Sequence, residues 1–356
     1  MTAGQRVLVF CGDKGIPLLG PGGASAHLRG VVRALVNRGH QVCVATPTAV
    51  DHRGTVAEEP LPAMGVHAPP RKWTGPLRER GETWDARRLM RHALRQFQPD
   101  LLWERHSLFV DAGVRAQKRL GIPRLLEINA PLILERPRIR GRKRAMRLTE
   151  QSLRTATGVA AVSDWLARWV VERGALPGRV ARVCNGTRLR PADGAPQGLV
   201  LAFVGSCRPW HGLHRFVPLL EALPEARVRI FGSGPTAPPS HPRIEPVGHL
   251  AHAELSAALA QCSVGLWFAD PARPWPCPLK LLDYRAVGLP VVADDGPEVR
   301  HLCGPHLRVA SGEPANWAAA VREAAALPRI PQVRQWETVV DESLRLVQTT
   351  HRSGER

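Results

Sequence analysis

The first half of the chain alternates short apolar runs with longer segments in which apolar residues recur every three or four positions. Residues 6–12 (RVLVFCG) are typical of a buried strand, and residues 24–38 have the apolar spacing of a helix that Gly39 would end. Further apolar runs of strand length lie at residues 41–46, 99–103, 122–128 and 157–162. This alternation predicts a parallel sheet that is covered by helices on both faces.

The alternation stops at residues 190–198 (RPADGAPQG), which are rich in Pro, Gly and Ala and have no periodicity. Such a segment is typical of a linker. Beyond it, strands are expected at residues 199–205, 227–231, 264–268 and 290–293, and helices at residues 214–223, 253–262, 279–287 and 336–348. The pattern therefore predicts an α/β protein with two tandem, Rossmann-like, doubly wound domains.

The domain boundaries follow from the same pattern. We expect a first domain over residues 1–190, a linker over 191–198 and a second domain over 199–330. A C-terminal helix in residues 331–356 is expected to pack back toward the first domain. Ligands bind outside the carboxyl ends of the strands in such sheets, and we expect two such edges to face each other across a cleft.

The composition is that of a folded chain: 356 residues, 44% hydrophobic and 22% charged. No apolar run approaches the ~20 residues that a membrane-spanning helix needs, and the first apolar stretch is too short for a secretory signal. We therefore expect a cytoplasmic protein with at most a peripheral contact at the inner membrane face. The seven cysteines form no CxxC pair and no cluster with histidine, so neither a metal site nor a disulfide framework is expected.

The formal net charge of +18 favours acidic small molecules, such as nucleotide diphosphates, and acidic membrane surfaces. Most of the basic residues are Arg scattered through both halves, and no known nucleic-acid-binding module is present. We expect no specific nucleic-acid partner. The densest basic segment, residues 136–147, is interrupted by Pro137 and Gly141. It predicts either a solvated loop or a weak, salt-sensitive membrane contact.

Two glycines, Gly22 and Gly23, precede the first predicted helix. A helix N-terminus preceded by glycines presents free backbone N–H groups to an anion, and only glycine lets a phosphate approach the backbone closely. A flexible turn is the alternative. The loop matches neither the GxGxxG fingerprint nor a Walker sequence, which disfavours a nicotinamide or ATP site.

Residues 278–293 (PLKLLDYRAVGLPVVA) read as a loop, a helix, a glycine cap and a strand. Lys280 and Asp283 are three positions apart on that helix, so both can reach one ligand. A carboxylate at Asp283 can accept hydrogen bonds from both hydroxyls of a ribose. The alternative is a surface ion pair of little energetic weight.

With these features in place, the chain resembles the retaining glycosyltransferases of family 4, which have the GT-B fold. The resemblance rests on motifs in family order: residues 22–46, VSDWL at 162–166, VCNGT at 183–187, FVGSCRPWHG at 203–212, FGSGP at 231–235 and residues 278–293. It implies a first domain on the acceptor side and a second domain that binds a nucleotide-sugar. The implied activity is that of a retaining hexosyltransferase.

The resemblance also implies roles around the donor diphosphate. Gly22 and Gly23 match the glycine-rich loop that lies against it. The family's usual Arg and Lys of the second domain are replaced, and His211 stands in the place of the Lys. Arg208 and Lys280 are therefore expected to supply the positive charge that the leaving diphosphate requires.

Asp283 matches the final Glu of the family's E-x7-E motif, the residue that grips the donor ribose. The first Glu of that motif, which usually contacts the donor sugar, is replaced by Trp275.

On the acceptor side, Asn129 stands where many family members have a catalytic-site His. Asn can donate a hydrogen bond to a sugar hydroxyl but cannot shuttle a proton. We name Glu127 and Asn129 as catalytic candidates, and Glu104 and His106 as acceptor-side candidates. For Glu127, Glu104 and His106, a structural hydrogen bond at the end of a strand is the alternative.

The family's stereochemistry implies a reaction on one face of the sugar, in which the acceptor attacks beside the departing diphosphate. No metal and no cofactor are expected, and the donor substrate is a nucleotide-diphosphate sugar. The donor base, the sugar and the acceptor are not readable from the sequence. Two alternatives stay open: a sugar-nucleotide epimerase of the same fold, and a non-catalytic protein that binds anions or nucleic acid.

Overall fold

The structure is a computed structural model that describes residues 4–20, 22–49, 61–74 and 77–354. The chain divides into two compact units. Unit 1 comprises Met1–Cys184, Trp275–Cys277 and Trp336–Arg356, and unit 2 comprises Asn185–Pro274 and Pro278–Gln335. The units differ from the expected domains at several places, among them Trp275–Cys277, which belong to unit 1 although they lie within the expected second domain. The chain divides at Cys184, before the expected boundary at 190, and the expected linker 191–198 belongs to unit 2.

The earlier boundary has a structural reason. Thr187 pairs with Gln335 as a parallel bridge, and its backbone N–H donates to the carbonyl of Arg334 at 2.9 Å. The segments that lead into and out of unit 2 therefore lie side by side. The hydrogen bonds of this pairing hold both segments in unit 2.

The described part of unit 1 has a seven-stranded parallel sheet in the order β3-β2-β1-β4-β5-β6-β7. Its strands are β1 (Arg6–Cys11), β2 (Gln41–Thr46), β3 (Met64–His67), β4 (Leu101–Arg105), β5 (Arg124–Ile128), β6 (Gly158–Ala161) and β7 (Val180–Arg182). Its helices are α1 (Gly23–Asn37), α2 (Arg78–Gln96), α3 (Ala112–Leu120), α4 (Leu132–Glu135), α5 (Arg142–Thr155), α6 (Asp164–Glu172) and α12 (Trp336–Gly354).

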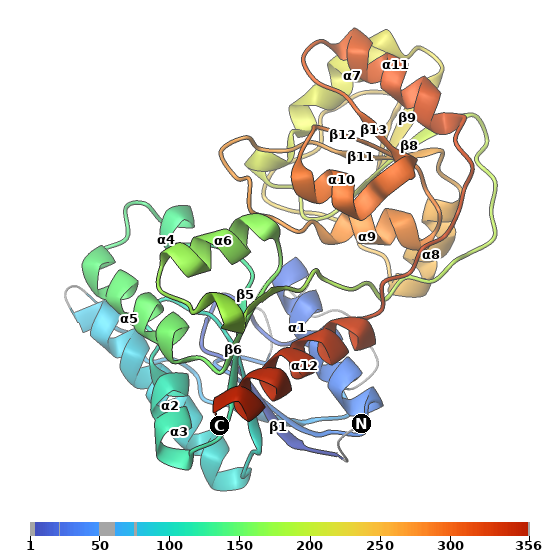
Figure 1. The fold of residues 1–356 in the computed structure, drawn as a ribbon. Coiled ribbons are helices and arrows are strands. Elements are labelled where there is room, and N and C mark those ends of the chain that lie inside the picture. The colour runs from blue at the N-terminus through green and yellow to red at the C-terminus, as the bar shows by residue number, and fades with distance from the viewer. Residues whose placement is uncertain (1–3, 21, 50–60, 75–76, 355–356) are drawn as a thin grey trace. The chain divides into compact units, whose positions relative to one another are not determined.

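Helices cover both faces of this sheet (Figure 1). Residues Leu8 and Phe10 of β1 belong to one apolar cluster with Leu89 of α2 and Ala116 of α3. On the other face α1 packs against α12. Gly30 of α1 allows this packing, because a Cβ atom there would lie 2.4 Å from the indole ring of Trp336.

The described part of unit 2 has a six-stranded sheet in the order β10-β9-β8-β11-β12-β13. Its strands are β8 (Leu199–Val204), β9 (Ala226–Phe231), β10 (Ile244–Gly248), β11 (Val264–Trp267), β12 (Val291–Ala293) and β13 (Leu307–Val309). Its helices are α7 (Phe216–Ala222), α8 (His252–Ala260), α9 (Leu279–Ala286), α10 (Pro297–Cys303) and α11 (Pro314–Ala325).

Helix α9 is fixed to the centre of this sheet by Tyr284. The buried hydroxyl of Tyr284 accepts a hydrogen bond from the backbone N–H of Val204 at 3.0 Å, and the carbonyl oxygens of Ala202 and Leu266 each lie 3.2 Å from it. Gly265 leaves room for the ring, since a Cβ atom there would lie 2.5 Å from it. Lys280 and Asp283 therefore sit on a helix whose position is set by β8 and β11.

The fold class predicted from the sequence is confirmed: each unit has a doubly wound parallel sheet. The sequence pattern did not reveal the edge strands β3, β7, β10 and β13. These strands are short, and their burial is incomplete: β7 has no fully buried residue. An apolar run is therefore missing from the sequence at these places.

All seven cysteines are buried, and none of them forms a disulfide. None of the described helices combines the length and the apolar composition needed to cross a bilayer.

Candidate functional site

The strand order places a topological switch point in each unit. In unit 1 it lies between β1 and β4, and in unit 2 it lies between β8 and β11. Loops that leave two such strands diverge to opposite sides, which opens a crevice at the carboxyl edge of the sheet. In unit 2 the loop after β8 carries Arg208 and His211, and the loop after β11 leads to Lys280 and Asp283. Four predicted donor-site residues thus belong to the elements around one switch point.

Lys280 is a buried cation without a hydrogen-bonded partner. Its side chain is 9% exposed, and its ammonium group lies 3.8 Å from the centre of the Phe203 ring. Among the described residues, no atom accepts a hydrogen bond from Nζ. Burial lowers the pKa of Lys280 to about 7, although the nearby Cys207 and Asp283 favour the charged form. The predicted alternative, a surface ion pair, is therefore not what this lysine forms.

Gly205 lies close to the ammonium group. A Cβ atom at Gly205 would lie 3.2 Å from Nζ of Lys280, and the backbone has a φ of +135°, which favours glycine. Glycine at this position therefore leaves the space beside the ammonium open to a ligand.

Asp283 is partly buried on the same helix. Its Oδ1 accepts a hydrogen bond from the hydroxyl of Thr187 at 2.6 Å. Burial raises the pKa of Asp283 to about 6, and the Thr187 hydrogen bond and the charge of Lys280 oppose this rise. Thr187 also accepts a hydrogen bond from the backbone N–H of Leu189 at 3.0 Å, which fixes its hydroxyl. Thr187 was not predicted as a site residue, although it lies in the VCNGT motif.

The loop after β8 carries both a neutral histidine and a charged arginine. His211 is held neutral, because burial and the charge of Lys280 lower its pKa to about 3. It can therefore contribute a hydrogen bond to a diphosphate but no charge. Arg208 is partly exposed, and its guanidinium lies 5.9 Å from the centre of the exposed Trp210 ring. Arg273 lies 4.3 Å from the same ring. The positive charge around this loop therefore comes from Lys280 and the two arginines.

In unit 1, Gly22 and Gly23 lie at the N-terminus of α1, as predicted. Gly22 is the N-cap residue with a φ of −76°, and no side chain caps the helix. A Cβ atom at Gly22 would meet nothing within 4 Å. Neither backbone conformation nor packing within the described protein requires glycine at Gly22, so the open space beside the helix N-terminus is available to an anion.

Glu127, at the end of β5, is an ionised carboxylate with both oxygens engaged. Oε1 forms an ion pair with His27 of α1, and Oε2 accepts a hydrogen bond from the indole N–H of Trp103 at 3.0 Å. Burial by itself would raise the pKa of Glu127, but His27, Arg105 and Trp103 together lower it to about 2. Glu127 is therefore unsuited to exchange protons near neutral pH, and we revise its predicted catalytic role to one of holding His27. His27 was not predicted as a site residue, because its position in the first helix is part of the apolar face.

Asn129 lies one residue beyond β5 and is partly buried. Its side-chain Nδ2 donates no hydrogen bond to any described residue. An amide group in this state can donate to a hydroxyl of a bound sugar, as predicted from the sequence.

Arg105, the last residue of β4, was not predicted as a site residue. It is 8% exposed, and its guanidinium donates no hydrogen bond to a described residue. In the sheet it is paired with Cys11 of β1 on one side and with Glu127 of β5 on the other. Its charge stabilises the neighbouring Glu127 carboxylate without a hydrogen bond, and its Nη1 is buried without a hydrogen-bond acceptor. Buried polar groups nearly always have such acceptors, so this N–H group at a switch point indicates a place for an acceptor atom of a ligand. A charged residue at the end of a buried strand was the signal in the sequence.

Glu104 is not available to an acceptor, and we correct that prediction. It points to the opposite face of β4 from Arg105, where it forms an ion pair with the fully buried Arg124 at 2.5 Å. A Cβ atom on Gly113 of α3 would lie 2.1 Å from the Glu104 carboxylate, which shows that α3 covers it. Glu104 therefore belongs to the core of unit 1.

His106 is also buried, and its Nε2 lies 3.1 Å from the hydroxyl of Thr149. Burial lowers the pKa of His106 to about 4, so the ring is neutral at physiological pH. Its Nδ1 has no hydrogen-bonded partner among the described residues. One ring nitrogen is thus structural, and the other remains a candidate contact for a ligand.

Trp275, which replaces the first Glu of the E-x7-E motif, has a structural role in unit 1. Its carbonyl accepts a hydrogen bond from the Ser163 hydroxyl at 2.8 Å, its indole N–H donates to Glu135 at 3.3 Å, and its ring packs 5.5 Å from that of Trp165.

Across the described residues, no group of three or more His, Cys, Asp or Glu side chains is arranged to hold a metal ion.

Comparison with known proteins agrees with this arrangement. Residues 21–190 match the model of the family described as Glycosyltransferase Family 4, and residues 198–326 match that of Glycosyl transferases group 1. None of the curated proteins is similar enough in sequence to be matched with this chain.

Solved structures share the whole fold at low sequence identity. The sucrose-phosphate synthase of Thermosynechococcus elongatus is 16% identical, with a TM-score of 0.70 over 99% of this chain and 98% of that one. HepE of Anabaena, solved with UDP and glucose, is 14% identical, with a TM-score of 0.63 over 99% of both chains.

The UDP-GlcNAc 2-epimerase of Methanocaldococcus jannaschii is 10% identical, with a TM-score of 0.58 over 97% of this chain and 99% of that one. The epimerase considered as an alternative thus shares the fold, whereas the family models match glycosyltransferases over both parts of the chain. The chain therefore belongs to the glycosyltransferases of family 4 and group 1, and it has their GT-B fold.

Proposed function

We propose that the protein transfers a hexosyl group from a nucleotide-diphosphate sugar to a hydroxyl acceptor, with retention of configuration and without a metal ion. The observation that carries this proposal is the buried, unpaired ammonium of Lys280 beside Asp283 at the switch point of unit 2. A free cation next to a free carboxylate oxygen fits a ligand that carries phosphate and vicinal hydroxyls together, as a nucleoside diphosphate does.

Each residue around the switch point then has a distinct task. Lys280 and Arg208 neutralise the negative charge that grows on the diphosphate as the glycosidic bond breaks. His211, which is neutral, contributes a hydrogen bond. Asp283 accepts hydrogen bonds from the ribose hydroxyls while Thr187 holds its other side.

The reaction forms a bond between the acceptor oxygen and the anomeric carbon, on the face from which the diphosphate leaves. The bond between that carbon and the diphosphate oxygen breaks, and this oxygen takes the proton of the acceptor hydroxyl. Two cations at the leaving group perform the charge neutralisation for which many transferases use a divalent metal. The protein otherwise aligns the reactants.

We assign Asn129 and Arg105 of unit 1 to the acceptor. Asn129 offers an unused N–H donor, and Arg105 offers a buried guanidinium whose Nη1 has no hydrogen-bond acceptor, although its charge also interacts with Glu127. An acceptor with a carboxylate or phosphate group would satisfy this guanidinium by a charge-assisted pair. HepE, with which this chain shares its fold, was solved with UDP and with UDP-glucose, which makes UDP the first nucleotide to examine.

Calorimetric titration of UDP, GDP and TDP in excess EDTA tests the donor site, followed by assays of donor turnover with the corresponding sugars. We expect one nucleotide to bind and its sugar conjugate to be consumed under chelation. Activity that vanished with EDTA and returned with Mn²⁺ or Mg²⁺ would contradict metal independence. Interconversion of UDP-sugars without any acceptor would instead establish the epimerase, and binding without turnover would establish a non-catalytic protein.

A further inference from the structure

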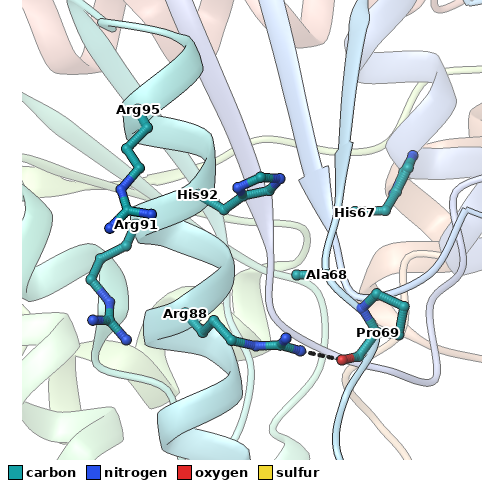
Figure 2. Close-up of a pocket in the computed structure, with 7 residues that line it drawn as sticks. All are labelled: His67, Ala68, Pro69, Arg88, Arg91, His92 and Arg95. Carbon is teal, nitrogen blue, oxygen red and sulfur yellow. Dashed lines mark hydrogen bonds between the residues drawn. The ribbon is translucent and has the colours of Figure 1, made fainter.

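A basic cavity lies in unit 1, on elements that the proposed donor site does not use. It has a volume of about 380 Å³ and lies between helix α2 and the chain at the end of β3. Figure 2 shows Arg88, Arg91, His92 and Arg95 on the helix, opposite the segment from His67 to Pro69. None of the described residues that line the cavity is acidic.

The helical repeat explains why these basic residues share one wall. Arg88, Arg91, His92 and Arg95 are three, four and seven positions apart, which places them on one face of α2. The opposite face carries Leu89, Met90 and Ala93, which are packed into the core of unit 1. The burial of the apolar face thus turns the basic face outward toward the cavity.

Two acidic residues on or beside α2 are occupied elsewhere. Asp85 accepts hydrogen bonds from the indole of Trp73 at 2.8 Å and from the backbone N–H of Arg71. Asp111 pairs with Arg87, which lies on the same helix but does not line the cavity. The arginines of the cavity wall are therefore left without counter-charges among the described residues, in contrast to Arg87 and to the fully buried Arg124.

The three arginines differ in how they are held. Arg88 donates to the carbonyl of Pro69, while its Nε is buried without a partner. Arg91 makes one long contact, 3.4 Å from Nε to the carbonyl of Arg87. Arg95 is in the last turn of α2, where the helix dipole favours a cation, but that effect does not extend to Arg88 and Arg91. Like charges one turn apart on a helix repel each other. The arginines that line the cavity therefore destabilise one another unless an anion binds between them.

We propose that this cavity is a second anion site, which takes a small ligand carrying one or two phosphate groups. Guanidinium groups match the geometry of phosphate oxygens in bidentate pairs, and the volume falls in the range of small-molecule pockets. The phosphates can belong to a free metabolite or to the headgroup of a lipid. The chemistry that recognises them is the same in both cases.

The test uses the full chain with Arg91→Gln and Arg95→Gln combined. Both side chains are exposed, so the double variant keeps the fold. The matched control, Lys118→Gln with Arg119→Gln, removes the same charge from exposed positions on α3. Inorganic pyrophosphate is titrated into each protein, and each protein is also sedimented with phosphatidylglycerol vesicles. Any pyrophosphate that binds at the donor site adds the same background to all three proteins, because none of them is altered in unit 2.

We expect the double variant to bind pyrophosphate at least tenfold more weakly than the natural protein, while the control changes less than twofold. Selective loss of vesicle binding in the double variant, with no pyrophosphate binding by any protein, would identify a lipid headgroup as the source. Equal behaviour of all three proteins in both assays would overturn the proposal. Because the comparison is among variants outside unit 2, this result does not depend on whether UDP binds as proposed.

Discussion

At the scale of single residues, Asp283 is the group whose change is most diagnostic. Asp283→Asn keeps the size of the side chain and can still accept the hydrogen bond of Thr187. It removes the negative charge that receives the ribose hydroxyls. We expect nucleotide affinity to fall by about 10- to 100-fold, equivalent to about 1–3 kcal/mol, in a calorimetric titration. Glu225→Gln, at an exposed ion pair of unit 2, is the control. Unchanged affinity in the Asp283 variant would remove the ribose assignment.

Lys280 is expected to lower the stability of the fold while it strengthens the binding of nucleotide. Its pKa is about 7 in the folded protein and 10.5 in its ordinary state, so folding releases a proton between these pH values. The free energy of unfolding therefore rises with pH from about 7 toward 10.5. The destabilisation caused by burying the charged ammonium is fully present below pH 7. Lys280→Met removes the buried charge. It should therefore stabilise the nucleotide-free protein by about 1–3 kcal/mol at pH 6, and by less at pH 9.

The measurement is thermal or urea unfolding at both pH values, combined with a nucleotide titration. The groups that face Lys280 are Cys207, Asp283 and His211, and none of them is altered in the variant. The same variant should lose most of its nucleotide affinity. A variant that was destabilised, or that bound nucleotide normally, would show that Lys280 has a structural partner.

Arg105 is the residue through which the acceptor can be characterised. With saturating donor, a panel of free sugars and their phosphate or uronate derivatives is offered as acceptors. We expect the natural protein to prefer anionic acceptors by tenfold or more in kcat/KM, because the buried guanidinium then gains its partner. Arg105→Gln should abolish that preference while nucleotide affinity stays the same, and Arg105→Lys should restore part of it. A natural protein indifferent to acceptor charge would refute the assignment.

At the scale of secondary-structure elements, the contact between α1 and α12 depends on one glycine. Gly30→Ala places a Cβ atom 2.4 Å from the Trp336 ring, so the two helices must separate or the indole must move. Overpacking of this kind costs about 1–3 kcal/mol, which thermal unfolding would detect. Gly178→Ala is the matched control on stability, since a Cβ atom there meets nothing within 4 Å and Gly178 is not among the glycines with positive φ. A Gly30 variant as stable as the natural protein would show that α12 adapts easily.

At the scale of the whole molecule, the basic segment 136–147 bears on membrane contact. Three of its arginines have partners within unit 1. Arg142 donates to the carbonyl of Ile133 at 2.7 Å, Arg144 donates to Thr83 at 2.8 Å, and Arg136 forms an ion pair with Asp13 at 3.6 Å. Ala145 is buried, so α5 turns an apolar side chain inward. Fewer cations are thus free for an acidic surface than the sequence suggests, at about 1 kcal/mol each.

We therefore expect weak binding to anionic vesicles that disappears as salt is raised to half-molar. Co-sedimentation with phosphatidylglycerol vesicles over a salt series measures this, and neutral vesicles provide the control. Association that survived high salt would indicate apolar insertion, which the exposed side chains of this segment do not provide.

The sequence by itself determined the doubly wound α/β class and the elements around the donor site. Central strands are buried on both faces and therefore appear as apolar runs, as at residues 6–12 and 199–205. The spacing of Lys280 and Asp283 on one helix follows from the helical repeat alone. Local rules were sufficient for these features, because the information lies within a few residues.

The tertiary structure decided which strand-end groups are free and which are already occupied. Glu104 and Arg105 are neighbours in sequence, yet alternation along β4 places Glu104 against the buried Arg124 and leaves Nη1 of Arg105 without a hydrogen-bond acceptor. Glu127 is engaged by His27, which lies 100 positions away in the chain. The state of a polar side chain depends on partners that only folding brings near, and its pKa depends on the burial they create. For this reason the sequence pattern indicated which strand ends carry polar residues, while the structure showed which of these residues already have partners.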